Sequence, residues 1–223
     1  MAKHLEKELE RLKKIIYSLS ARVEENLERA VKSFLENDAE QARKVIAADA
    51  TIDEMEVEVE EECLKALALY QPVAIDLRFI IAVMKMTNDL ERIGDLAADI
   101  AKNGRTINQA AKPRIPLDLH QMTYLVKAIV RKTLDALINI DPYLAREAIR
   151  DDGEINAMKA EMKDEIVAAL KREPDHAESL ITLLAITQRL ERIGDHATNI
   201  AEEVIYMVEG EIVRHGKGAL GLD

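Results

Sequence analysis

Two nearly identical stretches, "NDLERIGDLAADIA" at residues 88–101 and "QRLERIGDHATNIA" at residues 188–201, decide the fold. Aligned letter by letter, they agree at nine of their fourteen positions, including the whole of LERIGD. In each copy the apolar residues recur every three or four positions, which places them on one face of a helix. The repetition indicates that the chain contains two copies of one helical unit.

A second helical pattern is repeated as well. The apolar positions between residues 52 and 67 recur at the same spacing between residues 155 and 170, with a constant shift of 103 residues. They are Ile52, Met55, Val59, Cys63, Ala66 and Leu67, followed by Ile155, Met158, Met162, Ile166, Ala169 and Leu170. The run "DEMEVEVEEE" alternates like a strand, but the helix preference of glutamate and the 3–4 spacing around it outweigh that cue. The duplication therefore covers nearly the whole chain.

Five interruptions of the helical pattern divide the chain into six segments. Prolines mark four of them, because proline lacks an N–H group and clashes inside a helix, and "LENDAE" marks the fifth with capping side chains. The predicted helices are 4–36, 39–70, 73–108, 117–139, 142–172 and 175–212. We expect an all-α fold of two tandem, pseudo-symmetric antiparallel three-helix bundles, residues 1–110 and 111–223, because the connections are short.

Composition narrows the class of protein. Hydrophobic residues make up 48% of the chain and aromatic residues only 3%, which suits helix packing better than sheet packing. The formal net charge of −11 argues against a nucleic-acid partner. The single Cys63 fits a reducing compartment, and the N-terminus has no apolar signal core. Uncharged runs such as "SLITLLAITQ" are shorter than the roughly 20 residues of a membrane helix, so we expect a cytoplasmic protein.

Acidic residues form ladders beside the apolar stripes. Glu91, Asp95 and Asp99 are spaced by four, nearly opposite the stripe, and the second copy reads Glu191, Asp195 and Asn199. The preceding helix carries Asp49 and Asp53, which the shift of 103 aligns with Asp152 and Asn156. Neighbouring helices could bring these ladders together as oxygen ligands for Mg²⁺, Mn²⁺, Ca²⁺ or oxidised iron. Without a cation, such carboxylates would repel one another and their pKa values would rise.

An ordinary solvated face is the alternative for these ladders. Arg92 and Arg192 can pair with Asp95 and Asp195 three residues later, and exposed charge opposite an apolar stripe is common. Gly94 and Gly194 each cost the helix about 1 kcal/mol relative to alanine, which suggests close backbone approach or room for something bound. His196, which replaces Leu96 beside the acidic ladder, could join the ladder, but a lone surface histidine is the expectation.

No catalytic arrangement is apparent. "GKGALG" at residues 216–221 has the glycine spacing of a dinucleotide-binding loop but no helix after it. The only Glu-x-x-His spacing, Glu173 to His176, contains a proline, and no nucleophile lies beside a base. Cys63 occupies a stripe position and is expected to be inert packing.

Two copies of "ERIGDxxxxIA", each on the last helix of a three-helix repeat, closely resemble the PhoU family of phosphate-uptake regulators. The stretch "YQPVAIDLRFIIAVMKMTNDLERIGD" strengthens the resemblance, which spans the full chain. It implies two spectrin-repeat-like bundles whose surface motifs hold multinuclear metal clusters of Fe, Mn, Mg, Ca or Zn ions. Carried over by position, the metal ligands are Asp49, Asp53, Glu91, Asp95 and Asp99 in the first unit, and Asp152, Glu191, Asp195 and Asn199 in the second. Because Asn156 replaces an acidic residue, the second site should bind metal more weakly or not at all.

The resemblance also implies a function. It points to a cytoplasmic, non-enzymatic negative regulator of phosphate uptake and of the phosphate-starvation response. Such a protein would act as an adaptor between the ATPase subunit of the phosphate ABC transporter and the phosphate sensor histidine kinase, and would reach the membrane only through them. A homodimer stays open. Two alternatives remain from the residues themselves: a metalloenzyme that uses the carboxylates to activate water, and a purely structural helical scaffold.

Overall fold

The computed structural model describes residues 2–107, 118–211 and 213, and within them it consists of helices without a strand. The helices are α1 (Ala2–Glu36), α2 (Ala39–Tyr70), α3 (Ala74–Ile107), α4 (Leu119–Asn139), α5 (Pro142–Arg172) and α6 (Ala177–Glu209), with a 3-10 turn, η1 (Pro174–His176), before α6. The all-α prediction is confirmed, and the helix ends differ from the predicted ones by at most three residues. The predicted division near residue 110 lies in segment 108–117, outside the described residues.

Equivalent capping residues begin the second helix of each half. The Asp38 side chain accepts hydrogen bonds from the N–H groups of Glu40 and Gln41 at 3.0 and 2.9 Å, which caps α2. Asp141, 103 residues later, accepts hydrogen bonds from the N–H groups of Tyr143 and Leu144 and caps α5. The same turn chemistry therefore reverses the chain at the same point of both repeats.

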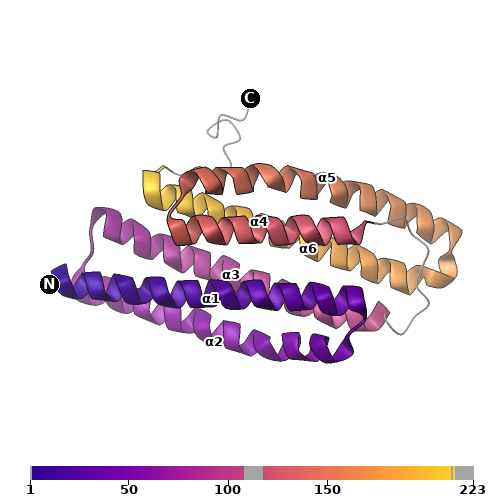
Figure 1. Cartoon of the computed structure of the whole chain (residues 1–223), viewed down its shortest axis with the longest axis horizontal. Coiled ribbons are helices and arrows are strands. Elements are labelled where there is room, and N and C mark those ends of the chain that lie inside the picture. The colour runs from indigo at the N-terminus through magenta and orange to yellow at the C-terminus, as the bar shows by residue number, and fades with distance from the viewer. Residues whose placement is uncertain (1, 108–117, 212, 214–223) are drawn as a thin grey trace.

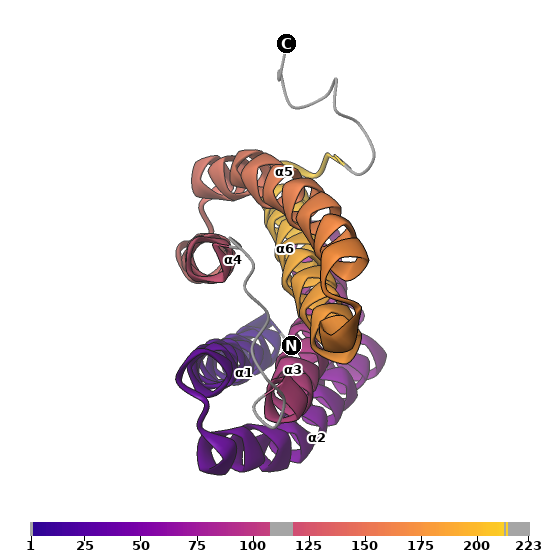
Figure 2. The ribbon, with the colours of Figure 1, turned by 90° about the vertical axis from the view of Figure 1, so that its right-hand side faces the viewer.

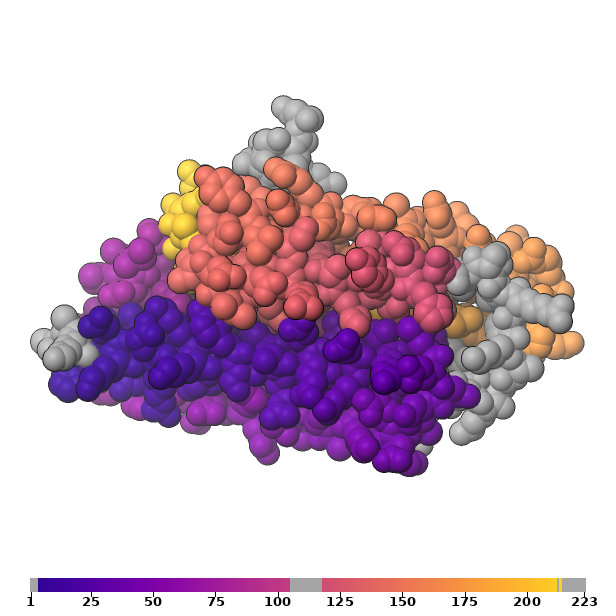
Figure 3. Space-filling model, viewed as in Figure 1, coloured from indigo at the N-terminus to yellow at the C-terminus, as the bar shows by residue number. Residues whose placement is uncertain are grey.

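The six helices form two three-helix bundles that lie side by side. Helices α1, α2 and α3 pack on one another, as do α4, α5 and α6, and each bundle has an interior of buried aliphatic residues (Figure 1). The end-on view shows α3 and α6 next to each other in the middle, with α1 and α4 along one side (Figure 2). In the space-filling view the two halves touch along the length of the molecule (Figure 3). Bundle-on-bundle packing through α3 and α6 was not foreseen from the sequence.

Polar side chains cross the seam between α3 and α6. Lys85 on α3 donates to Glu203 on α6 at 3.2 Å, and Arg189 on α6 donates to Asp99 on α3 at 3.1 Å. His196 on α6 lies 2.8 Å from Asp89 on α3, measured between Nδ1 and Oδ1, and its side chain is only 18% exposed. The expectation of a lone surface histidine was therefore wrong, because His196 faces the other bundle.

Two further features follow from the helical packing. Burial raises the pKa of the Cys63 thiol to about 12, so this side chain is the inert core residue that the stripe predicted. Within residues 2–107 and 118–211, no helix carries an apolar stretch long enough to cross a bilayer.

Candidate metal centre

Each bundle places its acidic residues beside a glycine at which its second and third helices lie in close contact. A Cβ atom at Gly94 of α3 would lie 3.1 Å from the Ile52 side chain of α2. A Cβ atom at Gly194 of α6 would lie 2.8 Å from Oδ1 of Asp152 on α5. Both glycines therefore allow a helix to pack directly on their backbone, and the carboxyl groups beside them are drawn partly out of water.

The first cluster contains Asp49 and Asp53 of α2 and Asp95 of α3. One carboxylate oxygen from each lies within 4.8 Å of the others, and the residues range from half-buried to exposed. Oxygen Oδ1 of Asp49 is buried and has no hydrogen-bond partner among the described residues. A buried oxygen without a partner destabilises the folded state. A hydrogen-bond donor or a cation beside this atom would remove that penalty.

Electrostatic repulsion within the first cluster is visible in its pKa values. Burial, followed by the charges of Asp95 and Asp53, raises the pKa of Asp49 to about 6 from 3.8. Burial and the charge of Asp95 also raise the pKa of Glu91, although Arg92, 3.4 Å away, opposes the shift. The cluster therefore holds more negative charge than its own basic neighbours balance.

These residues fit a hard cation. Carboxylate oxygens from two helices, at spacings that one ion can bridge, are the ligands preferred by Mg²⁺, Ca²⁺ and Mn²⁺. When bound there, a cation would supply the positive charge that the buried oxygen of Asp49 lacks. The side chain of Asp95 is 43% exposed, so one side of the cluster is open to solvent.

Asp99, the last member of the first ladder, is engaged elsewhere. Its oxygen Oδ2 accepts a hydrogen bond from Arg189 at 3.1 Å, and Oδ1 lies 3.5 Å from the Lys102 ammonium. Asp99 also contributes to the raised pKa of Asp49, so it lies within electrostatic range of the cluster. Its role as a ligand stays a prediction.

The second cluster, around Asp152, Glu191 and Asp195, is partly neutralised by residues of its own bundle. Lys159 of α5 donates a hydrogen bond to Glu191, and the Asn156 amide donates to Asp152 at 2.6 Å. Glu191 is only 9% exposed, which contradicts the outward-facing ladder expected from the sequence. Its partner Lys159 lies on α5, so this side chain is placed at the contact between α5 and α6 of its own bundle.

The second cluster nevertheless shares two properties with the first cluster, namely raised carboxyl pKa values and a buried oxygen without a hydrogen-bond partner in the described part of the chain. Burial, and after it the charge of Asp195, raises the pKa of Asp152 to about 6, and its Oδ1 also lacks a hydrogen-bond partner among the described residues. Burial and the charge of Glu191 raise the pKa of Asp195. Asn199 donates to Asp89 at 3.1 Å across the seam, and its role as a ligand stays a prediction.

Sequence reasoning missed Lys159, although the signal was present. The shift of 103 residues that aligns Asp49 with Asp152 also aligns Glu56 with Lys159, so the repeat exchanges an acid for a base. In the first half, burial and the charge of Glu60 raise the pKa of Glu56. The two clusters thus have the same backbone framework and different charge.

Comparisons with known proteins agree with this architecture. The family model described as the PhoU domain matches residues 16–104 and 119–204. The chain is 35% identical over 209 residues to the phosphate-specific transport system accessory protein PhoU homolog of Pseudomonas putida, covering 93% of this chain and 82% of the relative. It is 35% identical over 211 residues to the Aquifex aeolicus homolog of the same name, covering 94% of this chain and 95% of the relative.

Solved structures give the same result. The crystal structure of PhoU from Pseudomonas aeruginosa superimposes with a TM-score of 0.90 at 33% identity, over 92% of this chain and 99% of that chain. The phosphate transport system regulatory protein PhoU from Streptococcus pneumoniae superimposes with a TM-score of 0.84 at 30% identity, over 94% of this chain and 99% of that chain.

Proposed function

The chain belongs to the PhoU family, and from this premise we propose that it is a negative regulator of phosphate uptake that acts through protein contacts. The observation that carries the proposal is the match of both halves to the family, together with relatives named as accessory or regulatory proteins of phosphate transport. The protein would restrain uptake and the phosphate-starvation response when phosphate is plentiful.

The partners in this proposal are the ATPase subunit of a phosphate ABC transporter and a phosphate sensor histidine kinase. A chain of two helical bundles presents long helical faces on opposite sides, which suits simultaneous contact with two proteins (Figure 2). The regulator would work at the cytoplasmic face of the membrane, where its partners hold it.

Metal binding at the first cluster is part of the proposal. The support is the unpartnered Oδ1 of Asp49 and the neighbouring oxygens of Asp53 and Asp95. A cation there would join α2 to α3, and its role would be to stabilise one packing of the first bundle. The second cluster would stay without metal, because the ammonium group of Lys159 already lies beside Glu191.

A binding role is favoured over catalysis. Metal-assisted hydrolysis works best in a site that excludes water, whereas the side chain of Asp95 is 43% exposed. The metalloenzyme alternative would require a substrate to close over this open face. Raised carboxyl pKa values are common at active sites, but here the mutual proximity of the acids and their burial account for them.

The test is genetic. Deleting the gene should raise a phosphate-starvation reporter in phosphate-rich medium, and the intact gene supplied in trans should restore the low signal. A reporter that stays low in the deletion strain would contradict the regulatory role. Complementation with an Asp49→Asn, Asp95→Asn variant then asks whether the cation site is needed for regulation.

Elemental analysis separates the metal proposal from a purely structural scaffold. The purified protein should retain a cation after dialysis, and the Asp49→Asn, Asp95→Asn variant should not. Equal metal content in both proteins would contradict a specific site at the first cluster.

A further inference from the structure

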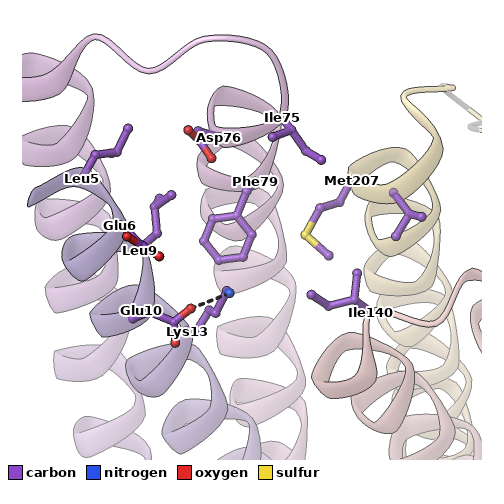
Figure 4. A pocket seen from close by; sticks show the side chains of 11 residues that line it. Leu5, Glu6, Leu9, Glu10, Lys13, Ile75, Asp76, Phe79, Ile140 and Met207 are labelled. Atoms are coloured by element: carbon purple, nitrogen blue, oxygen red, sulfur yellow. Dashed lines mark hydrogen bonds and ion pairs between the residues drawn. The ribbon is translucent and has the colours of Figure 1, made fainter. Parts of the chain in front are cut away.

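An apolar groove lies at one end of the molecule, where the two bundles meet. Its walls come from the start of α1, the start of α3, the turn between α4 and α5, and the end of α6, and its volume is about 620 Å³ (Figure 4). Apolar side chains form most of the surface: Leu5, Leu9, Ile75, Phe79, Ile140 and Met207. Figure 4 shows the Phe79 ring in the middle, between the side chains of α1 and those of the second bundle. An occupant of the groove would touch both halves.

Exposed apolar residues extend this surface past the groove itself. Ile75 is 61% exposed, and Val73, in the turn that precedes α3, is 73% exposed. Tyr143, close in sequence to Ile140 at the start of α5, is 78% exposed. Exposed apolar residues beside an apolar groove are typical of interaction sites, and a small molecule inside the groove would leave these residues in water.

The rim of the groove is acidic. Glu6 and Asp76 line it, and among the described residues neither has an ion-pair partner. Glu10 is paired with Lys13 at 2.7 Å, and the Lys13 ammonium also lies 5.8 Å from the centroid of the Phe79 ring. Lys13 is the basic residue among the described lining residues and is already paired, so the described charged residues of the rim, Glu6, Glu10, Lys13 and Asp76, sum to a negative charge.

We propose that this groove binds an amphipathic helix of a partner protein, with apolar residues on one face and lysine or arginine residues flanking them. Helices bind in this way when anchors at i, i+3 or i+4, and i+7 enter an apolar groove. Basic flanks would pair with Glu6 and Asp76, which gives orientation and speeds association. An anionic membrane surface would be repelled by the same carboxylates. The inference rests on the proposed function, since it assigns a surface through which the regulator contacts a partner.

The test uses the full chain and two synthetic peptides. The probe is a fluorescein-labelled peptide with leucines at helical spacing on one face and lysines on the other, and its counterpart has glutamate in place of every lysine. Fluorescence anisotropy at moderate salt measures both. The lysine peptide should bind, and the glutamate peptide should bind at least about tenfold more weakly.

Matched variants place the binding in the groove. Ile75→Asp should weaken the lysine peptide about tenfold, while Ile181→Asp should leave it unchanged. Ile181 is 58% exposed, so Ile75→Asp and Ile181→Asp replace side chains of nearly equal exposure. Ile181 lies near the start of α6, about 40 Å along this helix from Met207. Glu6→Lys should also weaken binding, whereas Glu161→Lys on the exposed face of α5 should not. All four positions are exposed or outside the core, so the variants should fold.

Several outcomes would overturn the inference. One is equal binding of the lysine peptide by the Ile75→Asp and Ile181→Asp variants, and another is equal or tighter binding of the glutamate peptide. A third is binding of an apolar dye or of anionic vesicles that depends on Ile75 while neither peptide binds, which would assign the groove to a small ligand or to a membrane.

The same variants distinguish this inference from the proposed function. If gene deletion raises the starvation reporter but the Ile75→Asp protein complements as well as wild type and binds the lysine peptide equally, the function stands and the groove assignment fails. If deletion leaves the reporter unchanged while Ile75→Asp abolishes peptide binding, the groove stands as a helix-binding site and the regulatory function fails.

Discussion

Lys159 of α5 forms an ion pair with Glu191 of α6 inside the second acidic cluster, at the position where the first half of the chain carries Glu56. The repeat therefore preserves the helix-packing framework and reverses the charge at one site. With the amide of Asn156 donating to Asp152, the second cluster supplies its own positive and polar partners. The first cluster has three neighbouring carboxylates and no equivalent lysine in α2.

Giving the second cluster the charge pattern of the first cluster should create a second metal site. In a Lys159→Glu, Asn156→Asp variant, the carboxylates around Asp152 and Asp195 would lose their internal cation and gain two oxygen ligands. Metal content per chain, measured by elemental analysis after dialysis, should about double. An unchanged content would show that Lys159 is not what keeps the second cluster free of metal.

Removing Asp49 should abolish most of the affinity at the first cluster. Asp49→Asn takes away a charged ligand at the most buried position, and the cation affinity should fall about tenfold or more, which calorimetric titration can measure. Asp152→Asn, the equivalent exchange in the second half, is the control and should leave the affinity unchanged. An equal loss of cation affinity in both variants would mean that the two clusters contribute equally to metal binding.

Stability of the cation-free protein should depend on pH through Asp49 and Asp152. Both have a folded-state pKa of about 6 against 3.8, so between these values the folded state binds more protons than the unfolded state. The free energy of unfolding should therefore rise as the pH falls from about 7 to about 5, by on the order of 1 kcal/mol per group, because half-exposure screens the charges. Urea titrations in the presence of a chelator measure this rise.

Two comparisons check the assignment of this pH dependence. An Asp49→Asn, Asp152→Asn variant should lose the rise, because it has no proton to bind at these positions. Adding a divalent cation should reverse the trend for the wild-type protein, since protons compete with the metal for Asp49. If the free energy of unfolding of the wild-type protein shows no rise as the pH falls, and so behaves like that of the variant, these carboxyl groups do not have the proposed role.

The glycine in each ERIGD motif should be hard to replace. Gly94→Ala improves helix propensity by about 1 kcal/mol, but its Cβ would lie 3.1 Å from Ile52, and overpacking costs about 1–3 kcal/mol. We expect a net loss on the order of 1 kcal/mol in the free energy of unfolding. Gly153→Ala on α5 is the control, because a Cβ there has no neighbour within 4 Å, and it should stabilise by about 0.5–1 kcal/mol.

The helices and their grouping could be predicted because periodicity and punctuation are local signals. Pro142 and the capping aspartates mark helix starts directly, and the duplicated stripes show which faces are buried. The helix cost of Gly94 predicted close backbone approach or room for something bound, and the structure shows close approach to Ile52 of α2. These features depend on interactions within a few turns of helix, and sequence spacing encodes them.

Contacts between the bundles were outside the reach of this reasoning. Glu191 and His196 of α6 both read as polar surface positions, yet Glu191 is buried beside Lys159 of α5 and His196 lies against Asp89 of α3. A polar side chain that is satisfied across an interface has the same sequence pattern as one in solvent. The groove around Phe79 was missed for a related reason, since it is assembled from four separate segments whose ends meet only after folding.

Helix α3 belongs at once to the first acidic cluster, through Asp95, and to the seam with α6, through Asp99 and its pair with Arg189. One helical turn separates these two aspartates, a distance over which charge is felt strongly. Thermodynamic linkage couples cation binding at the cluster to the association of the two bundles. If cation binding changes the stability of the contact between the bundles, a protein that weakens or strengthens this contact must change the cation affinity by the same factor. A partner that binds at the end of the molecule could in this way cause the acidic cluster to take up or release an ion.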